Sequence, residues 1–407
     1  MWAEISLQAI LRNLEIIRKH VDGNGHHGGK RGSGGQARHG EPNGKRMVLA
    51  VVKSNAYGLG AVPISKALQK AGTEWFGVTC ANEGVELRES GIRKRILVLT
   101  GFWPGEEKRL LENRLTPTVT RVDDLRHLER AAKTFLGKSA RGKSSPGKSS
   151  RVRFHLKINT GMNRLGISRD EVDAFCHMLK KCAHIELEGT YTHFASAEDF
   201  TAKQTSDQEL LFRSCLDRME KLGVSPGIVH MANSGAISAR PSTLGDMVRP
   251  GAILYGYYQS FDPPQKKQEV MSQMRLEPCL TLRARIISLR GVPAGEGVGY
   301  GARFITKRPS RIAVINAGYA DGVVRARTNR GFALLHGRCV PLVGIISMDL
   351  TMLDVTDVPG AKIGDVVTIY GEDGAARIDV SDVAREIGTV TSDLLCALGR
   401  RVPKFYA

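Results

Sequence analysis

Short apolar runs alternate with amphipathic segments over the first 256 residues of the chain. The amphipathic segments repeat apolar residues every three or four positions, and one of them places Ser168 and Glu171 at capping-box spacing. Strands that alternate with helices over about 250 residues predict a (β/α)8 TIM barrel, in which function lies at the carboxyl ends of the strands. The eight candidate strands are 47–52, 76–80, 96–100, 117–120, 152–158, 187–193, 228–232 and 247–255.

The pattern changes beyond roughly residue 270. Short alternating or apolar runs bounded by Gly and Pro predict a mostly-β C-terminal domain, with two short helices near its end. We therefore divide the chain into a barrel over 1–270 and a β domain over 271–407. Because no long linker separates them, we expect the two domains to pack together.

Composition narrows the class of protein. A content of 42% hydrophobic and 25% charged residues is typical of a soluble protein, and no apolar run reaches the roughly 20 residues that cross a bilayer. The N-terminus alternates apolar and charged residues, unlike a signal peptide, so we expect a cytoplasmic protein without a membrane partner. The seven cysteines contain no CxxC pair, which argues for reduced thiols and against a zinc site.

Half of the net charge of +18 lies in two segments rich in Gly, Ser and basic residues. Residues 22–46 carry +3 and residues 137–153 carry +6. We expect flexible basic insertions at 22–46 and 137–151, because such compositions cannot pack a core. Neither segment interleaves aromatic residues that could stack on bases, so we expect no specific nucleic-acid binding.

Reactive and cationic side chains follow several of the predicted strands. A lysine whose pKa is lowered by burial and cationic neighbours can form a Schiff base, and Lys53 closes the first apolar run. Ser234 opens a predicted helix and Gly251 permits close backbone approach, so both suit a phosphate. Together these features favour pyridoxal 5'-phosphate. The strand-end residues are Lys53, Arg164, His193, Ser234, Arg249 and Gly251.

Eight motifs in order along both domains give the chain its resemblance to a known family. They are AVVKSNAYGLG, KINTGMNRLG, YTHFASAED, HMANSGA, VRPGAILYG, GYGARF, INAGYADGV and ISMDLTMLD. With them the chain resembles the alanine racemases, which are fold-type III pyridoxal-phosphate enzymes. The resemblance implies interconversion of L-alanine and D-alanine, which supplies D-alanine for peptidoglycan. It also implies a homodimer.

The resemblance implies a role for each matching residue. Lys53 would bind the cofactor and act as base on one face of the substrate Cα, and Tyr319 would act on the other face, since racemisation needs two groups. Tyr319 and Met348 would come from the partner subunit. Arg249 would donate to the pyridine nitrogen, and His193 would bridge Arg249 and Tyr319.

The remaining roles concern the phosphate and the substrate carboxylate. Arg164 would contact the carboxylate and the phenolic oxygen of the cofactor, and the Met348 backbone would hold the same carboxylate. Tyr300 would shape the pocket mouth, and Lys157 matches a lysine that family members often carry as a carbamate. The phosphate would be held by Tyr57, Ser234, Gly251 and Ala252.

Several residues depart from the pattern of the family, and three of them bear on the expected site. Asn159 replaces an aspartate, Asn163 replaces a glycine, and Ser392 stands where many members have a second phosphate-binding tyrosine. A roomier pocket at Ser392 predicts tolerance for L-serine beside L-alanine. Two alternatives therefore stay open: a racemase of broad specificity for alanine and serine, and a non-catalytic carrier of pyridoxal phosphate. Tyr319 argues against the carrier, because a carrier does not need a second base.

Overall fold

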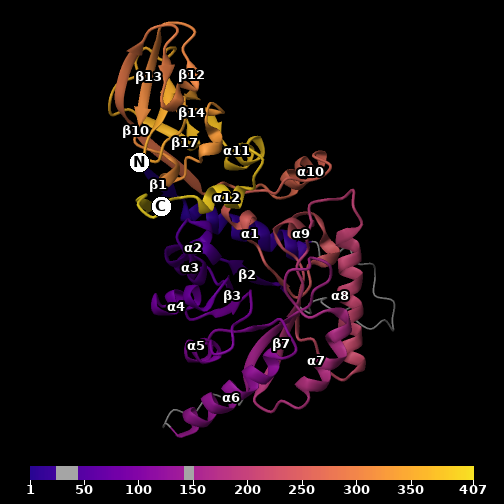
Figure 1. Cartoon of the computed structure of the whole chain (residues 1–407). Coiled ribbons are helices and arrows are strands. Elements are labelled where there is room, and N and C mark those ends of the chain that lie inside the picture. The colour runs from indigo at the N-terminus through magenta and orange to yellow at the C-terminus, as the bar shows by residue number, and fades with distance from the viewer. Residues whose placement is uncertain (24–44, 142–150) are drawn as a thin grey trace.

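The computed structural model describes residues 1–23, 45–141 and 151–407, which form a barrel and a second, mostly-β domain (Figure 1). Two helices reach into the predicted basic insertions, since α1 spans Leu7–Gly23 and α6 spans Asp124–Arg141. The rest of the two insertions lies almost entirely outside the described residues. No helix in the described part of the chain is long and apolar enough to cross a membrane.

Eight parallel strands build the barrel, and they confirm the eight apolar runs. They form two four-stranded arcs, β4-β3-β2-β9 and β5-β6-β7-β8. A parallel bridge from Leu97 to Thr116 joins the arcs on one side, and Asp246 N donates to Val229 O over 2.8 Å on the other. The strands are β2 (Met47–Val51), β3 (Trp75–Val78), β4 (Arg95–Val98), β5 (Thr118–Val119), β6 (Val152–Lys157), β7 (Ile185–Tyr191), β8 (Ile228–His230) and β9 (Met247–Val248).

Helices follow the strands and cover the outside of the barrel (Figure 1). The predicted capping box is present, because Ser168 N and Ser168 Oγ both donate to Glu171 Oε2 at the start of the turn that leads into α7. The barrel helices besides α1 and α6 are α2 (Lys53–Tyr57), α3 (Ala61–Lys70), α4 (Ala81–Glu89), α5 (Glu107–Glu112), α7 (Val172–Leu179), α8 (Gln204–Lys221), α9 (Ser234–Ala239), the short 3-10 turn η4 (Ala252–Tyr255) and α10 (Gln265–Gln273).

The second domain is organised around a nine-stranded sheet with the order β18-β17-β14-β15-β16-β13-β10-β1-β19. A separate hairpin pairs β11 (Gly297–Val298) with β12 (Phe304–Ile305). The strands of the large sheet are β1 (Trp2–Ile5), β10 (Leu280–Val292), β13 (Ser310–Ile315), β14 (Phe332–Leu335), β15 (Arg338–Val343), β16 (Thr351–Asp354), β17 (Val366–Asp373), β18 (Ala376–Ile378) and β19 (Lys404–Tyr406).

The first strand of the chain differs from the domain division drawn from the sequence. β1 lies between β10 and β19 in the second sheet, not in the barrel. Its side chains Ala3 and Ile5 are fully buried there, and its backbone is hydrogen-bonded on both sides. Four residues give too short a pattern to show which sheet they join.

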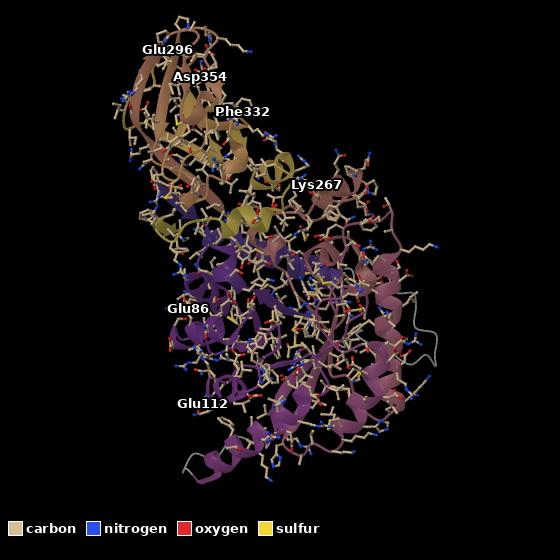
Figure 2. The ribbon with its side chains drawn as sticks, in the orientation of Figure 1. Glu86, Glu112, Lys267, Glu296, Phe332 and Asp354 are labelled. Atoms are coloured by element: carbon tan, nitrogen blue, oxygen red, sulfur yellow. The ribbon has the colours of Figure 1, made fainter. Side chains whose placement is uncertain are left out.

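The end of the chain packs on the barrel. α12 (Thr391–Cys396) lies beside α2, where a Cβ on Gly58 would come 2.5 Å from Leu395 O. Tyr406 Oη also donates to Leu59 O over 3.0 Å. The two domains therefore meet beside Lys53, while the preceding helix α11 (Val380–Glu386) lies further along the β domain (Figure 1). Side chains fill both domains, with charged residues such as Glu86 and Glu296 on the outside (Figure 2).

Candidate active site

Lys53 stands at the carboxyl end of β2, at the start of an unusual turn. The next four residues, 54–57, all have positive φ angles, between 52° and 58°. This left-handed turn contains no glycine, and each such residue costs roughly 1 kcal/mol. Glu83 supports the turn, because its carboxylate accepts from Ser54 N over 2.6 Å and from Thr79 N over 2.7 Å. The strained turn therefore lowers the stability of the fold while it holds Lys53 at the rim of the barrel.

Cations gather around Lys53. Burial lowers the pKa of Lys53, and the charge of Arg164 lowers it further. The pKa of Lys157 falls to about 7, first through burial and then through the charges of Arg249, Arg164 and Lys53. The charges of Lys53, Lys157, Arg164 and Arg249 therefore act on one another at one end of the barrel. At both lysines the lowered pKa makes the neutral amine, the form that reacts with a carbonyl carbon, more accessible than at an exposed lysine.

Arg249 lies in the barrel interior, and its donors meet backbone carbonyls. Nη1 donates to His230 O over 2.8 Å, and Nη2 donates to Thr192 O and Met231 O over 2.7 and 2.9 Å. Burial lowers its pKa to about 10, so the guanidinium stays charged at neutral pH. Its Nε makes no hydrogen bond to any described residue and remains able to donate to an acceptor above the rim.

His193 lies within 3.4 Å of Arg249 through its Nδ1. Burial and the charges of Arg249 and its cationic neighbours hold the pKa of His193 well below its usual value, so its imidazole is neutral. Since Arg249 Nη2 is a donor only, His193 Nδ1 accepts and Nε2 carries the proton. His193 therefore presents an N–H to a partner on the side away from Arg249.

Two buried histidines extend this network, and the sequence did not single them out. Arg249 Nη1 donates to His230 Nδ1 over 3.1 Å, so His230 Nε2 donates to His155 Nδ1 over 2.9 Å. Burial lowers the pKa of His155 to about 3 and that of His230 well below its usual value. One signal could have found His155: it stands two residues before Lys157 on one strand, which places both side chains on the same face.

The residues expected to hold a phosphate lie close together beside the rim. Gly251 N donates to Ser234 Oγ over 2.9 Å, and a Cβ on Gly251 would come 2.4 Å from Tyr57 Oη. The Tyr57 ring lies 5.1 Å from the Tyr255 ring, which fixes its direction. Ala252 follows as the first residue of η4. The structure thus brings Tyr57, Ser234, Gly251 and Ala252 together, and the backbone at Gly251 lies so close to Tyr57 Oη that a side chain at this position would overlap it.

The loop that carries Arg164 accommodates both substitutions near it. Asn159 Oδ1 accepts from Gly161 N and Asn163 N over 3.2 and 2.9 Å, which are bonds that an aspartate would also accept. Asn163 has a φ of 55°, a conformation that suits glycine and that asparagine tolerates. The two departures from the family pattern therefore leave the loop intact.

The residues expected to act on the opposite face lie on the β domain and are exposed. Tyr319, Met348 and Tyr300 have exposed fractions of 40%, 54% and 70%. No hydrogen bond among the described residues joins them to the barrel residues at the rim. Ser392 lies on α12, the helix that packs beside α2 and Lys53.

Comparison with known proteins agrees with this geometry. The family model for the alanine racemase N-terminal domain matches residues 36–259, and that for the alanine racemase C-terminal domain matches residues 279–406. Alanine racemase 2 of Caldanaerobacter subterraneus is 37% identical over 99% of this chain and 94% of its own.

Solved structures show the same architecture over the whole chain. The alanine racemase from Streptomyces lavendulae superposes with a TM-score of 0.85 at 30% identity, covering 100% of this chain and 96% of that one. The alanine racemase from Bacillus anthracis, solved with bound L-Ala-P, has a TM-score of 0.81 at 29% identity, covering 100% and 94%. With both family domains in place and close relatives matching from end to end, the chain belongs to the alanine racemase family.

Proposed function

We propose that this chain interconverts L-alanine and D-alanine with pyridoxal 5'-phosphate as cofactor, and so supplies D-alanine for peptidoglycan. The observation that carries the proposal is the rim itself. A lysine of lowered pKa lies there with Arg164, Arg249 and His193, and the turn that follows it brings Tyr57 against Gly251. The full-length matches to alanine racemases support the choice of substrate.

The residues present fit the cofactor. Tyr57 and Ser234 offer two hydroxyls close to Gly251, from which a phosphate could accept hydrogen bonds. Arg249 Nε is available for the pyridine nitrogen, and because arginine keeps its proton, that nitrogen would stay unprotonated. Lys53 would hold the aldehyde carbon. When bound, pyridoxal phosphate supplies the electron sink that makes a proton at the amino-acid Cα removable.

The chain's own residues would move the proton. Lys53 Nζ would take or return it on one face of Cα, since its lowered pKa favours the neutral amine. Tyr319 Oη would act on the other face, with His193 Nε2–H as the group that orients it. Arg164 and the Met348 amide would hold the carboxylate. Met348 N makes no hydrogen bond to any described residue, so that donor is available to the substrate.

The active site would form between two copies of the chain. Tyr319, Met348 and Tyr300 are exposed on the β domain, and no hydrogen bond among the described residues joins them to the rim of their own barrel. A closed homodimer places the same surface of each copy against the other, so two equivalent sites result. The free cysteines, which form no disulfide in the described chain, suit a cytoplasmic enzyme.

A second candidate is a racemase that also accepts serine. It is favoured by Ser392, a small residue on the helix beside Lys53 where many relatives of the family carry a tyrosine. A non-catalytic carrier of pyridoxal phosphate would need neither the exposed Tyr319 nor the Met348 amide.

A racemisation assay of three proteins tests the proposal. The wild type should interconvert the two alanine enantiomers, and Lys53→Ala should lose at least about 10³-fold in kcat. Tyr319→Phe should keep the cofactor but exchange the Cα proton of L-alanine and D-alanine with solvent deuterium at unequal rates. Racemisation by Lys53→Ala without added amine would contradict the assignment.

A further inference from the structure

Tyr319 and Met348 lie on two neighbouring loops at the same end of the large sheet. Strands β13 and β16 pair antiparallel, with Ile315 opposite Thr351, so the loop after β13 meets the loop before β16. Tyr319 N donates to Ser347 O over 3.0 Å, and Ala320 N donates to Met348 O over 3.1 Å. The backbones of the two loops are therefore in direct contact.

Glycine is needed at this contact. A Cβ on Gly318 would come 2.3 Å from Met348 O, which no real side chain tolerates. Thr351 Oγ1 also donates to Ala317 O over 2.7 Å. Backbone contacts therefore hold the two loops together near Gly318. Further along, the loops are connected by the side chains of residues that follow Tyr319 and Met348.

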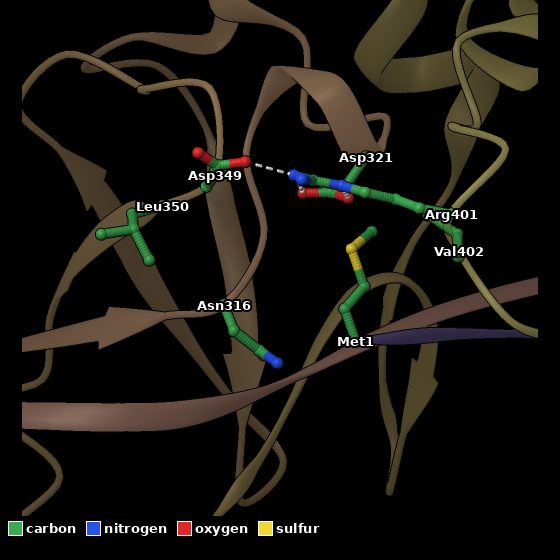
Figure 3. A pocket seen from close by; sticks show the side chains of 7 residues that line it. All are labelled: Met1, Asn316, Asp321, Asp349, Leu350, Arg401 and Val402. Atoms are coloured by element: carbon green, nitrogen blue, oxygen red, sulfur yellow. Dashed lines mark hydrogen bonds and ion pairs between the residues drawn. The ribbon is translucent and has the colours of Figure 1, made fainter.

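Arg401, near the end of the chain, joins the side chains of Asp321 and Asp349. Arg401 Nε and Nη2 donate to the two oxygens of Asp321 over 2.7 and 3.0 Å, and Nη2 also donates to Asp349 Oδ1 over 2.5 Å (Figure 3). Asp321 is two residues beyond Tyr319, and Asp349 directly follows Met348. The guanidinium thus spans both loops.

The bridge is anchored firmly on the Tyr319 side. The Asp321 side chain is only 7% exposed, and its Oδ2 also accepts from Gly318 N over 3.0 Å. The bidentate geometry fixes direction as well as distance, which a lysine cannot do. Beside the bridge lies a pocket of about 400 Å³, which Met1, Asn316 and Leu350 also line (Figure 3).

We infer that Arg401 is a positioning residue, which sets the separation between the Tyr319 side chain and the Met348 amide. This inference rests on the proposed two-base racemisation, in which those two groups face one substrate from the same domain. Arg401 touches neither the substrate nor the cofactor. It acts through Asp321 and Asp349, and a displacement of about 1 Å at such groups costs about 10²-fold in rate.

The test compares Arg401→Met with Arg401→Lys and a matched control, Arg308→Met. Arg308 also pairs with an aspartate of the β domain, Asp357 over 2.6 Å, but is remote from the two loops in the strand pairing. Arg401→Met should lose at least about tenfold in kcat/KM for alanine, with a higher KM and a lower kcat. Arg401→Lys should recover part of the loss, and Arg308→Met should equal the wild type.

Two further readouts separate positioning from folding. Cofactor absorbance and the thermal midpoint of Arg401→Met should stay close to those of the control. The ratio of deuterium exchange rates for L-alanine and D-alanine should shift in the direction seen for Tyr319→Phe. If the exchange rates of L-alanine and D-alanine fell by the same factor, so that their ratio was unchanged, the inference would be overturned.

If Arg401→Met does not fold, Asp349→Asn decides, because Asp349 is 55% exposed and its loss leaves the Asp321 pair intact. It should raise the KM for alanine, and an unchanged KM would overturn the inference. A wild-type chain without racemase activity would overturn the proposed function itself. An active wild type with kinetics unchanged in Arg401→Met would overturn only the role of Arg401.

Discussion

The two halves of the proposed site are built in opposite ways. At the barrel rim, Arg249 and His193 are buried and hydrogen-bonded to their own chain, and Lys53 lies among cations that lower its pKa. On the β domain, Tyr319 and Met348 are 40% and 54% exposed and are held by backbone contacts between two loops and by the Arg401 bridge. The barrel half is complete within one chain, whereas the β-domain half presents its groups outward.

Because of this difference, substitutions in the two halves should affect stability and catalysis in different proportions. Removing a buried donor at the rim leaves carbonyls of the same chain unpaired, so it should damage both the fold and the cofactor site. Removing an exposed group on the β domain should damage only the reaction. Substitutions in the two halves should therefore leave distinct signatures, and the following predictions use that contrast.

The largest effect is expected at Arg249. Arg249→Leu leaves the carbonyls of His230, Thr192 and Met231 without their donor, which should lower the free energy of unfolding by roughly 3 kcal/mol or more. Urea unfolding measures the loss, and cofactor binding should fall with it. The same change at exposed Arg308 should leave the urea midpoint close to that of the wild type. Equal losses at the two positions would contradict the account.

Gly251→Ala should act on the cofactor with less effect on the fold. The new methyl group would lie 2.4 Å from Tyr57 Oη, in the space assigned to the phosphate. Affinity for pyridoxal phosphate should fall by at least about tenfold, which corresponds to roughly 1.4 kcal/mol. Gly291→Ala is the control, because nothing lies within 4 Å of its added Cβ. If Gly251→Ala bound pyridoxal phosphate with unchanged affinity, the phosphate would not lie beside Gly251.

Lys157 should show a pH dependence within the barrel half. Its pKa of about 7 means that the neutral amine, which reacts with carbon dioxide, predominates above that pH and is lost below it. A carbamate signal from 13C-labelled bicarbonate should therefore grow as the pH rises through 7, and should be missing in Lys157→Met. A signal that is independent of pH over this range would contradict the lowered pKa.

The smallest effect is expected at Ser392. Ser392→Tyr would place a bulky hydroxyl-bearing ring on α12 beside the lysine turn. It should tighten cofactor binding and reduce exchange of the serine Cα proton relative to that of alanine by a few-fold, a change of about 1 kcal/mol. The wild type must first exchange serine measurably. No detectable exchange with serine, while alanine exchanges fast, would show that the pocket is not roomier.

Much of the barrel half could be predicted from the sequence, because buried parallel strands are continuous apolar runs and rim residues follow them directly. The left-handed turn after Lys53 could not, since none of its four positive-φ residues is a glycine. The place of β1 in the second sheet depends on pairing with strands more than 270 residues away, which periodicity does not encode.

The remaining site residues needed three-dimensional structure for a similar reason. His230 and His155 join Arg249 only through the barrel interior, and no local pattern links them. Arg401 reaches Asp321 across 80 positions of the chain. The roles of Tyr319 and Met348, expected from the family resemblance, stay predictions, because their exposure is consistent with a shared site without demonstrating one.

The most direct test of the shared site mixes two inactive variants. Lys53→Ala and Tyr319→Phe homodimers are dissociated, combined in equal amounts and reassociated. If each site takes Lys53 from one copy and Tyr319 from the other, every mixed dimer contains one intact site, and about a quarter of the wild-type racemase activity should return. If Lys53 and Tyr319 of one chain form a site together, mixed dimers stay inactive, and that result would contradict the account.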